Sequence, residues 1–375
     1  MTSEGPAGEP LGGQSRAGPS PVGLDAVRAL LSAAPDASAV TVGIHRAGQQ
    51  AFVATGTTTH HGDHPAAADT RFEVGSLTKT FTALLLAEQN ARGEVALHDA
   101  AAHYLPAGTQ LPAGGTAITL LHLATHTSGL PRLPSGLLRT ALPRLLSNPY
   151  ADFTHADLLD AFSRTRLRSR PGTRVRYSNF GVGLLGHLLC AAAGGPPYEE
   201  LLAERILGPL ALHHTNCTPD PAPHTAVTGH WRGRPRPPFD IPGLPAAGAV
   251  RSSARDLLTL TQALLSSRCD AVPATTPTPL ATTPAPLRTA LADVTRPRLT
   301  LPNGTGLALL WNTRTRPDGS TLYHHSGGTR GCTAFAGFSP AHDTALVALA
   351  NSAPGHGNHL IQRAYEALLS LLPES

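Results

Sequence analysis

Strand patterns occur at both ends of this 375-residue chain, and helix patterns fill the middle. Near the N-terminus, residues 39–45 and 50–55 predict a hairpin that turns at Ala47-Gly48. Four more strands are expected late in the chain, at 306–314, 321–325, 333–339 and 345–351. A sheet assembled from both ends must carry the middle of the chain as an insertion. The sequence therefore predicts an α/β protein of the α+β type, with an antiparallel sheet flanked by helices.

Apolar residues at helical spacing run through the intervening segment. In 76–91, Leu77, Phe81, Leu84 and Leu85 recur about one turn apart, which predicts a helix that opens at its serine. Further helices are expected at 24–34, 119–125, 155–165, 178–193, 198–207, 254–267 and 359–372. The insertion, approximately residues 80–265, is predicted to be a mostly helical lobe.

Local composition sets the expected boundaries. Residues 1–22 are rich in Gly, Pro and Ser, so we expect a disordered N-terminal segment. Residues 23–374 are then one domain, and residues 271–299, rich in Pro, Thr and Ala, are expected to form a flexible loop. No apolar core of a signal peptide precedes the domain, and no stretch approaches the ~18 apolar residues of a membrane span.

Charge and cysteine usage narrow the classes further. The net charge is +4, but the arginines are scattered, so the sequence predicts neither a nucleic-acid partner nor a membrane. The arginines of 164–176 are interpreted mainly as a solvated face, and otherwise as help in attracting an anionic substrate. Cys190, Cys217, Cys269 and Cys332 form no C-x-x-C pair, so buried free thiols are expected. Together these features predict a soluble cytoplasmic protein; a chain whose signal had been removed would look the same.

The chemistry is indicated first by Lys79, the one lysine among 29 Lys and Arg residues. It lies three positions after Ser76, so both side chains are expected on the same face of one helical turn. Arginine stays protonated in proteins, whereas a buried lysine can lose its proton. Ser76-x-x-Lys79 therefore indicates a hydroxyl beside an amine that can act as a base, although so short a motif also occurs by chance.

Two later motifs fit the same chemistry. Tyr177-Ser178-Asn179 opens a predicted helix, and a tyrosine hydroxyl acts as a base only beside a strong cation. His325-Ser326-Gly327-Gly328 ends a predicted strand, where glycines let a substrate lie close to a backbone N–H. Either motif alone is weak evidence, but the three occur in order on a helix start, a loop and a strand.

With these motifs the chain resembles the serine β-lactamase and penicillin-binding-protein superfamily. It is most similar to the branch of class C β-lactamases, DD-carboxypeptidases, D-aminopeptidases and related esterases. The similarity extends through 126–131, 247–253 and 345–351, and covers roughly residues 24–370. It implies a β-lactamase/DD-peptidase-like fold.

The resemblance also implies roles. Ser76 would be the nucleophile, Lys79 would activate it as a neutral amine or by sharing a proton, and Tyr177 would relay the proton to the leaving group. Asn179 would bind a substrate amide or hold Lys79. The N–H groups of Ser76 and Gly328 would form the oxyanion hole, with Ser326 and Gly327 also beside the substrate.

His325 stands where many β-lactamases have lysine. It would contact a substrate carboxylate or tune the pKa of Tyr177, but a mostly neutral imidazole is a poor carboxylate anchor. Arg330 is a candidate replacement. We therefore expect a serine acyl-enzyme hydrolase or acyltransferase for a small ester, amide or D-amino-acid peptide, with no cofactor and with water or another nucleophile as acceptor. The alternatives are a DD-carboxypeptidase or weak β-lactamase, and a non-catalytic binding protein on the same fold.

Other conspicuous residues have plainer interpretations. His126 is expected to hydrogen-bond the turn that follows it, and Asp256 with Arg255 to cap a helix. The adjacent histidine pairs lack further ligands at a recognisable spacing, so no metal site is predicted. Trp231 and Phe239 are expected either in a small apolar cluster or in a wall of the substrate cleft.

Overall fold

A computed structural model describes residues 27–137, 148–219, 225–267, 282–301, 303–355 and 357–373. The predicted disorder of residues 1–22 and the position of Cys269 lie outside these ranges. The other three cysteines lie within these ranges, and all are free thiols: Cys190, Cys217 and Cys332.

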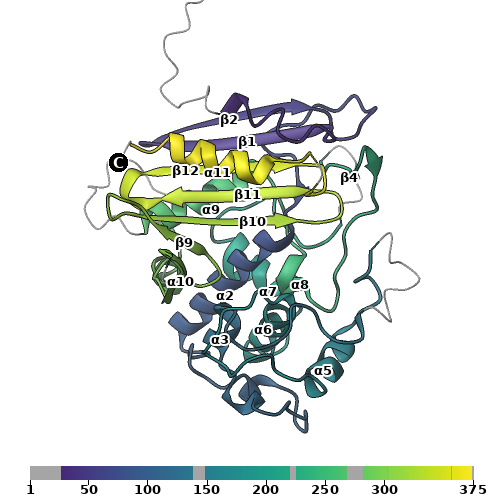
Figure 1. Ribbon diagram of the computed structural model, residues 1–375, viewed down its shortest axis with the longest axis vertical. Helices are drawn as coiled ribbons and strands as arrows, with labels where there is room; N and C mark the ends of the chain where they lie inside the picture. Colours follow the sequence, from purple (N-terminus) through teal and green to yellow (C-terminus); the bar gives the residue numbers. More distant parts are fainter. Residues whose placement is uncertain are drawn as a thin grey trace, which may run out of the picture.

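An eight-stranded antiparallel sheet joins the two ends of the chain (Figure 1). Its order is β2 (Gln49–Gly56), β1 (Ala39–Arg46), β12 (Thr344–Ala350), β11 (Thr333–Ser339), β10 (Thr321–Gly328), β9 (Asn312–Thr315), β8 (Thr305–Leu307) and β7 (Leu299–Thr300). The register of β1 on β12 pairs Val40 with Ala350 and Arg46 with Thr344. The predicted sheet built from both ends, with helices on it, is therefore confirmed.

Helices cover both faces of the sheet because its central strands are apolar on both sides. In β12, Val347 belongs to the cluster that includes α9 (Ala254–Ser266), and Leu346 to the cluster that includes α11 (Leu360–Ser370). Adjacent strand residues point to opposite faces, so a continuous apolar run is what a doubly covered strand requires. Figure 1 shows α11 in front of the sheet and α9 behind it.

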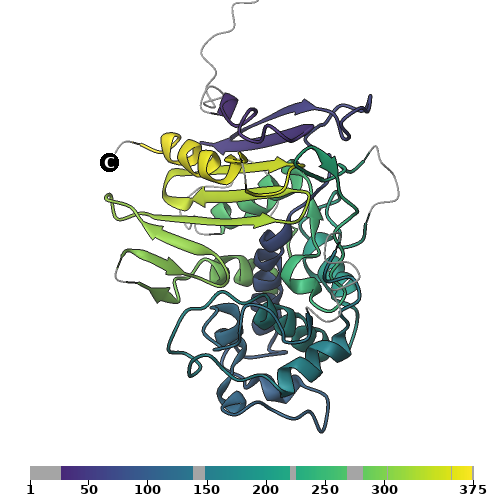
Figure 2. The ribbon, with the colours of Figure 1, turned by 45° about the vertical axis from the view of Figure 1, so that its right-hand side comes forward.

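Helix α2 (Thr78–Arg92) lies between the sheet and the helical lobe in both views (Figures 1 and 2). Residues 78–89 of α2 are all buried, so it is a core helix and not an amphipathic surface helix. The helices of the lobe are α3 (Leu120–Ala124), α5 (His155–Ser163), α6 (Asn179–Ala192), α7 (Tyr198–Leu202), the π-helical turn η5 (Ala203–Leu207) and α8 (Pro245–Gly248).

Three expectations need correction. The segment 271–299, predicted to be a flexible loop, contains helix α10 (Ala285–Val294), which packs against α2 and buries Leu287 and Leu291. Residues 271–281 of this segment lie outside the described residues. The single strand expected at 306–314 is two strands, β8 and β9, separated by a buried turn that holds Trp311. Of the helix expected at 24–34, Val27 and Arg28 are helical, residues 29–32 form turns, and residues 33–34 are not helical.

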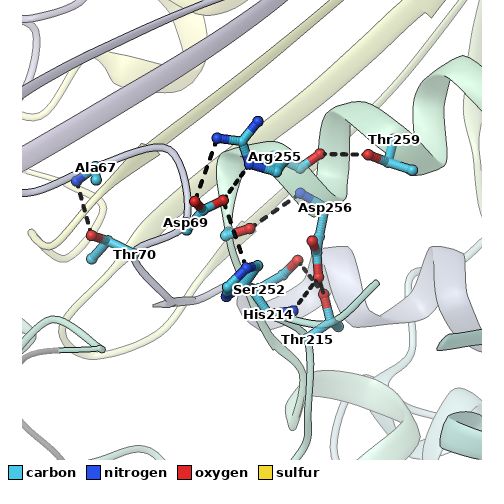
Figure 3. Close-up of polar contacts among 10 residues, drawn as sticks. Ala67, Asp69, Thr70, His214, Thr215, Ser252, Arg255, Asp256 and Thr259 are labelled. Atoms are coloured by element: carbon cyan, nitrogen blue, oxygen red, sulfur yellow. Dashed lines mark hydrogen bonds and ion pairs between the residues drawn. The ribbon is translucent and has the colours of Figure 1, made fainter. Parts of the chain in front are cut away.

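Hydrogen bonds and an ion pair connect the start of α9 to segments that lie far from it in the sequence (Figure 3). Ser253 caps the helix by accepting a hydrogen bond from Asp256 N, as expected for this pattern. The Asp256 carboxylate itself accepts 2.7 Å hydrogen bonds from His214 N and Thr215 Oγ1. Asp256 therefore joins two segments, and the capping role predicted for it belongs to Ser253. The neighbouring Arg255 forms an ion pair with Asp69.

We predict that Asp256→Ala lowers the free energy of unfolding by about 2–3 kcal/mol, because it leaves a buried N–H and hydroxyl without their acceptor. Asp69→Ala is the matched control: its ion pair with Arg255 is half exposed, and its loss should cost less than about 1 kcal/mol. Urea unfolding measures both. Equal changes in the two variants would contradict the structural role given to Asp256.

Candidate active site

Ser76 lies in a short 3-10 turn, η1 (Gly75–Leu77), that leads directly into α2. Gly75 has φ +50°, a conformation that side chains with a Cβ adopt rarely. This bend places Ser76 at the start of the helix, where backbone N–H groups have no partner within the helix. The nucleophile predicted from the sequence thus stands at a helix start that also lines a cleft.

The end of β10 packs directly on this turn, backbone against backbone. A Cβ on Gly327 would lie 1.9 Å from Val74 O and 2.9 Å from Ser76 N, and one on Gly75 would lie 2.5 Å from Gly328 O. Only glycine permits this approach at positions 75 and 327, whereas a Cβ on Gly328 would instead lie 2.5 Å from the Pro354 ring. The approach brings the backbone of Gly328 beside Ser76, as an oxyanion hole of their two N–H groups requires.

Lys79 is fully buried, and its amine has two hydrogen-bond partners. Its Nζ lies 3.0 Å from Ser76 Oγ and donates to Ala247 O at 2.7 Å. Burial lowers the pKa of Lys79 well below its usual value, and the charge of Arg132 lowers that pKa further. The amine therefore favours its neutral form, in which the nitrogen lone pair can accept the Ser76 proton.

Tyr177 completes the group, 101 positions along the chain from Ser76. Its hydroxyl donates to Ser76 Oγ at 2.5 Å, and Lys79 Nζ lies 5.1 Å from the centre of its ring. Burial raises the pKa of Tyr177, and the contacts with Ser76 and Arg132 act in the opposite direction. Before substrate binds, the phenol is thus protonated and donates its hydrogen bond to Ser76 Oγ. This contact allows a proton to move between the two hydroxyl groups.

The turn at His126 fixes Tyr177 in place. His126 has φ +56°, its carbonyl accepts from Arg176 N, and its Nδ1 accepts from Ser178 N at 3.3 Å. Burial lowers the pKa of His126 to about 3, so the ring is neutral and can accept that bond. A structural role for His126 is confirmed, but its partners flank Tyr177, whereas the sequence had predicted them in the turn after His126.

His325 does not provide a charge for substrate binding. It is buried, and its Nδ1 contacts Ser326 O at 2.8 Å. Burial, with a smaller contribution from Lys79, lowers the pKa of His325 to about 3, so the ring is neutral at physiological pH. Of the two roles expected of His325, contact with a substrate carboxylate is not supported by a buried neutral ring, and His325 is not among the causes that shift the pKa of Tyr177.

A cleft of about 390 Å³ opens at Ser76 between the helical lobe and the end of β10. Of the predicted residues, Ser76, Asn179 and Gly328 line it, as does Phe239, the expected aromatic wall. Among the described residues the Asn179 amide oxygen has no hydrogen-bond partner, and Asn179 lines the cleft, so this oxygen is a candidate acceptor for a substrate. Trp231 is instead exposed on strand β4 (His230–Trp231), where Arg232 and Arg236 lie over its ring.

Arg132 and Arg330 also line the cleft, and their guanidinium groups give it a positive charge. Arg330 follows the Gly-Gly motif, and the sequence had suggested it as an anchor. Arg132 was missed, although it directly follows the motif at 126–131, and that adjacency was the available signal. The six arginines of 164–176 are all exposed, as a solvated face predicts.

Within the described ranges, neither a metal-binding cluster nor a membrane-spanning helix is present. No group of three or more His, Cys, Asp or Glu side chains there is arranged to hold a metal ion. Among the helices of those ranges, none is both long and apolar enough to cross a membrane.

Comparison with known proteins agrees with this geometry. The family described as Beta-lactamase matches residues 27–371. The chain belongs to this family of serine hydrolases. A class C beta lactamase from Rhodobacter sphaeroides has the same fold, with a TM-score of 0.75 over 93% of this chain and 98% of that one, at 24% identity.

Curated relatives match over shorter stretches. The D-alanyl-D-alanine-carboxypeptidase/endopeptidase AmpH of Escherichia coli K12 is 32% identical over 221 residues, which are 58% of this chain and 55% of AmpH. A Beta-lactamase of Pseudomonas fluorescens is 30% identical over 235 residues, 61% of this chain and 58% of that protein. The chain thus matches little more than half the length of these relatives.

We predict that Lys79→Arg lowers the rate of acylation at Ser76 by roughly 10²- to 10⁴-fold, because arginine keeps the charge but cannot accept a proton. Lys79→Met, which removes the amine at similar length, should be equally slow. Labelling kinetics with an active-site probe measure the rates, and urea unfolding checks that both variants fold. A Lys79→Arg variant within tenfold of the wild-type rate would show that Lys79 acts as a cation.

Proposed function

We propose that this protein is a serine acyl-enzyme hydrolase or acyltransferase that acts on a small ester, amide or D-amino-acid peptide. The observation that carries the proposal is that one hydroxyl, Ser76 Oγ, is hydrogen-bonded by both a neutral buried amine and a phenol beside an open cleft. A non-catalytic binding protein would have no need to bury a lysine in this way, since an uncompensated buried amine costs stability.

In the proposed reaction Ser76 Oγ attacks the substrate carbonyl carbon as its proton passes to the lone pair of Lys79 Nζ, either directly or through the Tyr177 hydroxyl, which takes the Ser76 proton only as it gives its own to Lys79. The carbonyl oxygen takes the negative charge beside the N–H groups of Ser76 and Gly328. As the carbonyl re-forms, the bond to the leaving group breaks, and Tyr177 donates a proton to that group. Water, an alcohol or an amine then attacks the acyl-enzyme by the reverse route, and its proton returns to the same two groups.

The neutral, buried His325 supports an ester or amide substrate over efficient β-lactam hydrolysis. The expected cytoplasmic location belongs to the same proposal: an enzyme in that compartment would act on metabolites, including acylated intermediates of a biosynthesis, and not on the cell wall. Since water and other acceptors use the same residues, hydrolysis and transfer are both part of the proposal.

The second candidate is a DD-carboxypeptidase or weak β-lactamase. It is favoured by the name of the relative AmpH and by Arg132 and Arg330, whose guanidinium groups can bind the carboxylate of a peptide or β-lactam in the cleft.

We predict that a fluorophosphonate or a penicillin forms a covalent adduct on Ser76, and that Ser76→Ala forms none. Intact-protein and peptide mass spectrometry locates the adduct. Steady-state rates on p-nitrophenyl esters, D-amino-acid amides and cephalosporins then rank the candidates, and we expect the esters or amides to be turned over fastest. Adduct on another residue, or none with either probe, would refute the proposal, whereas a preference for cephalosporins would select the second candidate.

A further inference from the structure

The proton transfers at Ser76 take place among buried groups that carry little charge. The two imidazoles beside them, His126 and His325, both have a pKa lowered to about 3 by burial and are neutral. A buried phenol loses its proton only with difficulty unless a positive charge is near, because desolvation disfavours the phenolate. The site therefore needs a cation that does not depend on pH.

Arg132 lies where such a cation acts. Its guanidinium carbon is 5.3 Å from the centre of the Tyr177 ring. Its backbone is fixed to the same helix start as Tyr177, because Arg132 O accepts hydrogen bonds from Asn179 N at 2.9 Å and Phe180 N at 3.3 Å. The preceding Pro131 O accepts from the hydroxyl of Ser178 at 2.7 Å. These contacts hold the backbone of Arg132 against the residues that directly follow Tyr177.

The charge of Arg132 acts on both proton-transfer groups. It is a cause of the lowered pKa of Lys79, second to burial, and it lowers the pKa of Tyr177 against the effect of burial. Within the described ranges, no carboxylate lies within ion-pair distance of Arg132, so its charge is not neutralised there. A guanidinium remains protonated across the whole physiological range.

We propose that Arg132 is the permanent positive charge of this active site, a positioning residue that keeps Lys79 in its neutral form and favours the move of a proton away from the Tyr177 hydroxyl. This inference rests on the proposed function. It assigns a role to a residue of the loop after α3, outside the three motifs that the sequence supplies.

The ionisable groups around Lys79 and Tyr177 come from several elements. Lys79 and Tyr177 face each other across Ser76, with His126 from the end of α3 and His325 from β10. Tyr150 lines the same cleft as Arg132 and Arg330: burial raises its pKa, and the charges of both arginines act in the opposite direction.

Arg330 is therefore the matched control. It lines the same cleft and its charge reaches Tyr150, but it is not among the causes that shift the pKa of Lys79 or Tyr177. If Arg132 acts through the catalytic pair, only its removal will change how the reaction depends on pH. If it only attracts ligands, the two arginines will behave alike.

The test is the second-order rate of labelling of Ser76 by an uncharged alkyl fluorophosphonate between pH 5 and pH 10. In this reaction Ser76 Oγ bonds to phosphorus, its proton passes to the neutral Lys79 amine, directly or by way of the Tyr177 hydroxyl, and fluoride leaves, so the probe reports proton acceptance without a charged substrate. Since Arg132 lowers the pKa of Lys79, its removal raises that pKa, and the acidic limb of the profile moves to higher pH.

We expect Arg132→Gln to label roughly five- to tenfold more slowly than wild type at pH 6 and less than twofold more slowly at pH 9. Arg132→Met, which keeps packing on the Tyr177 ring, should match it, and Arg132→Lys should restore the wild-type profile. Arg330→Gln should keep the shape of the wild-type profile, whatever its effect on rate.

A uniform loss across pH in both neutral variants, or an Arg132→Lys variant as deficient as Arg132→Gln, would overturn the inference and leave the proposed function standing. Wild-type protein that the probe fails to label at any pH would instead overturn the proposed function. Circular dichroism and urea unfolding of each variant separate these results from loss of fold.

Discussion

The burial of one amine is the constraint on which the site depends. Lys79 lies on α2, a helix packed between the sheet and the helical lobe, and its side chain is fully buried. A charged ammonium there would have to be compensated, but its hydrogen-bond partners are a carbonyl, Ala247 O, and a hydroxyl, Ser76 Oγ. Packing thus forces the amine toward its neutral state, and a neutral amine beside a hydroxyl is a base beside a nucleophile. The proposed chemistry follows from the position of α2 in the core.

The two lobes meet at Ser76, and the side chain of Glu73 connects the two sides of the cleft. Glu73, from strand β3 (Phe72–Glu73), accepts 2.6 Å hydrogen bonds from Phe239 N and from Thr329 Oγ1. Phe239 belongs to the wall of the cleft, and Thr329 follows directly on Gly328. One carboxylate, three residues before the nucleophile, therefore fixes both sides of the opening relative to Ser76. The helical lobe contributes Tyr177 to this meeting point, and the sheet contributes the Gly327-Gly328 backbone.

The sequence predicted the sheet and the three motifs well because both are local patterns: period-two and period-3.6 apolar spacing, and short runs of reactive residues. Prediction from the sequence failed where burial, or the composition of neighbouring segments, determined the structure or the charge of a residue. Helix α10 has Leu287, Ala290, Leu291 and Val294 at helical spacing, but the Pro- and Thr-rich stretch before it concealed the pattern. Burial, which the residue type does not reveal, removes the charge that a surface histidine could gain, so the carboxylate role expected of His325 is not supported. Arg132 was missed because its place over Tyr177 depends on a turn, not on a motif.

The use of lysine in this chain fits the same physical argument. Arginine occupies every other position among the 29 Lys and Arg residues, including Arg132 and Arg330 in the cleft. Those positions need a charge that persists, which a guanidinium supplies at any physiological pH. Position 79 needs the opposite, a nitrogen that can give up its proton inside the protein and take one back, and among the basic side chains with a long flexible stem only lysine can do so. A permanent cation at 132 and a neutral amine at 79 are therefore complementary: the first helps to keep the second uncharged, and exchanging the two residue types would remove both properties at once.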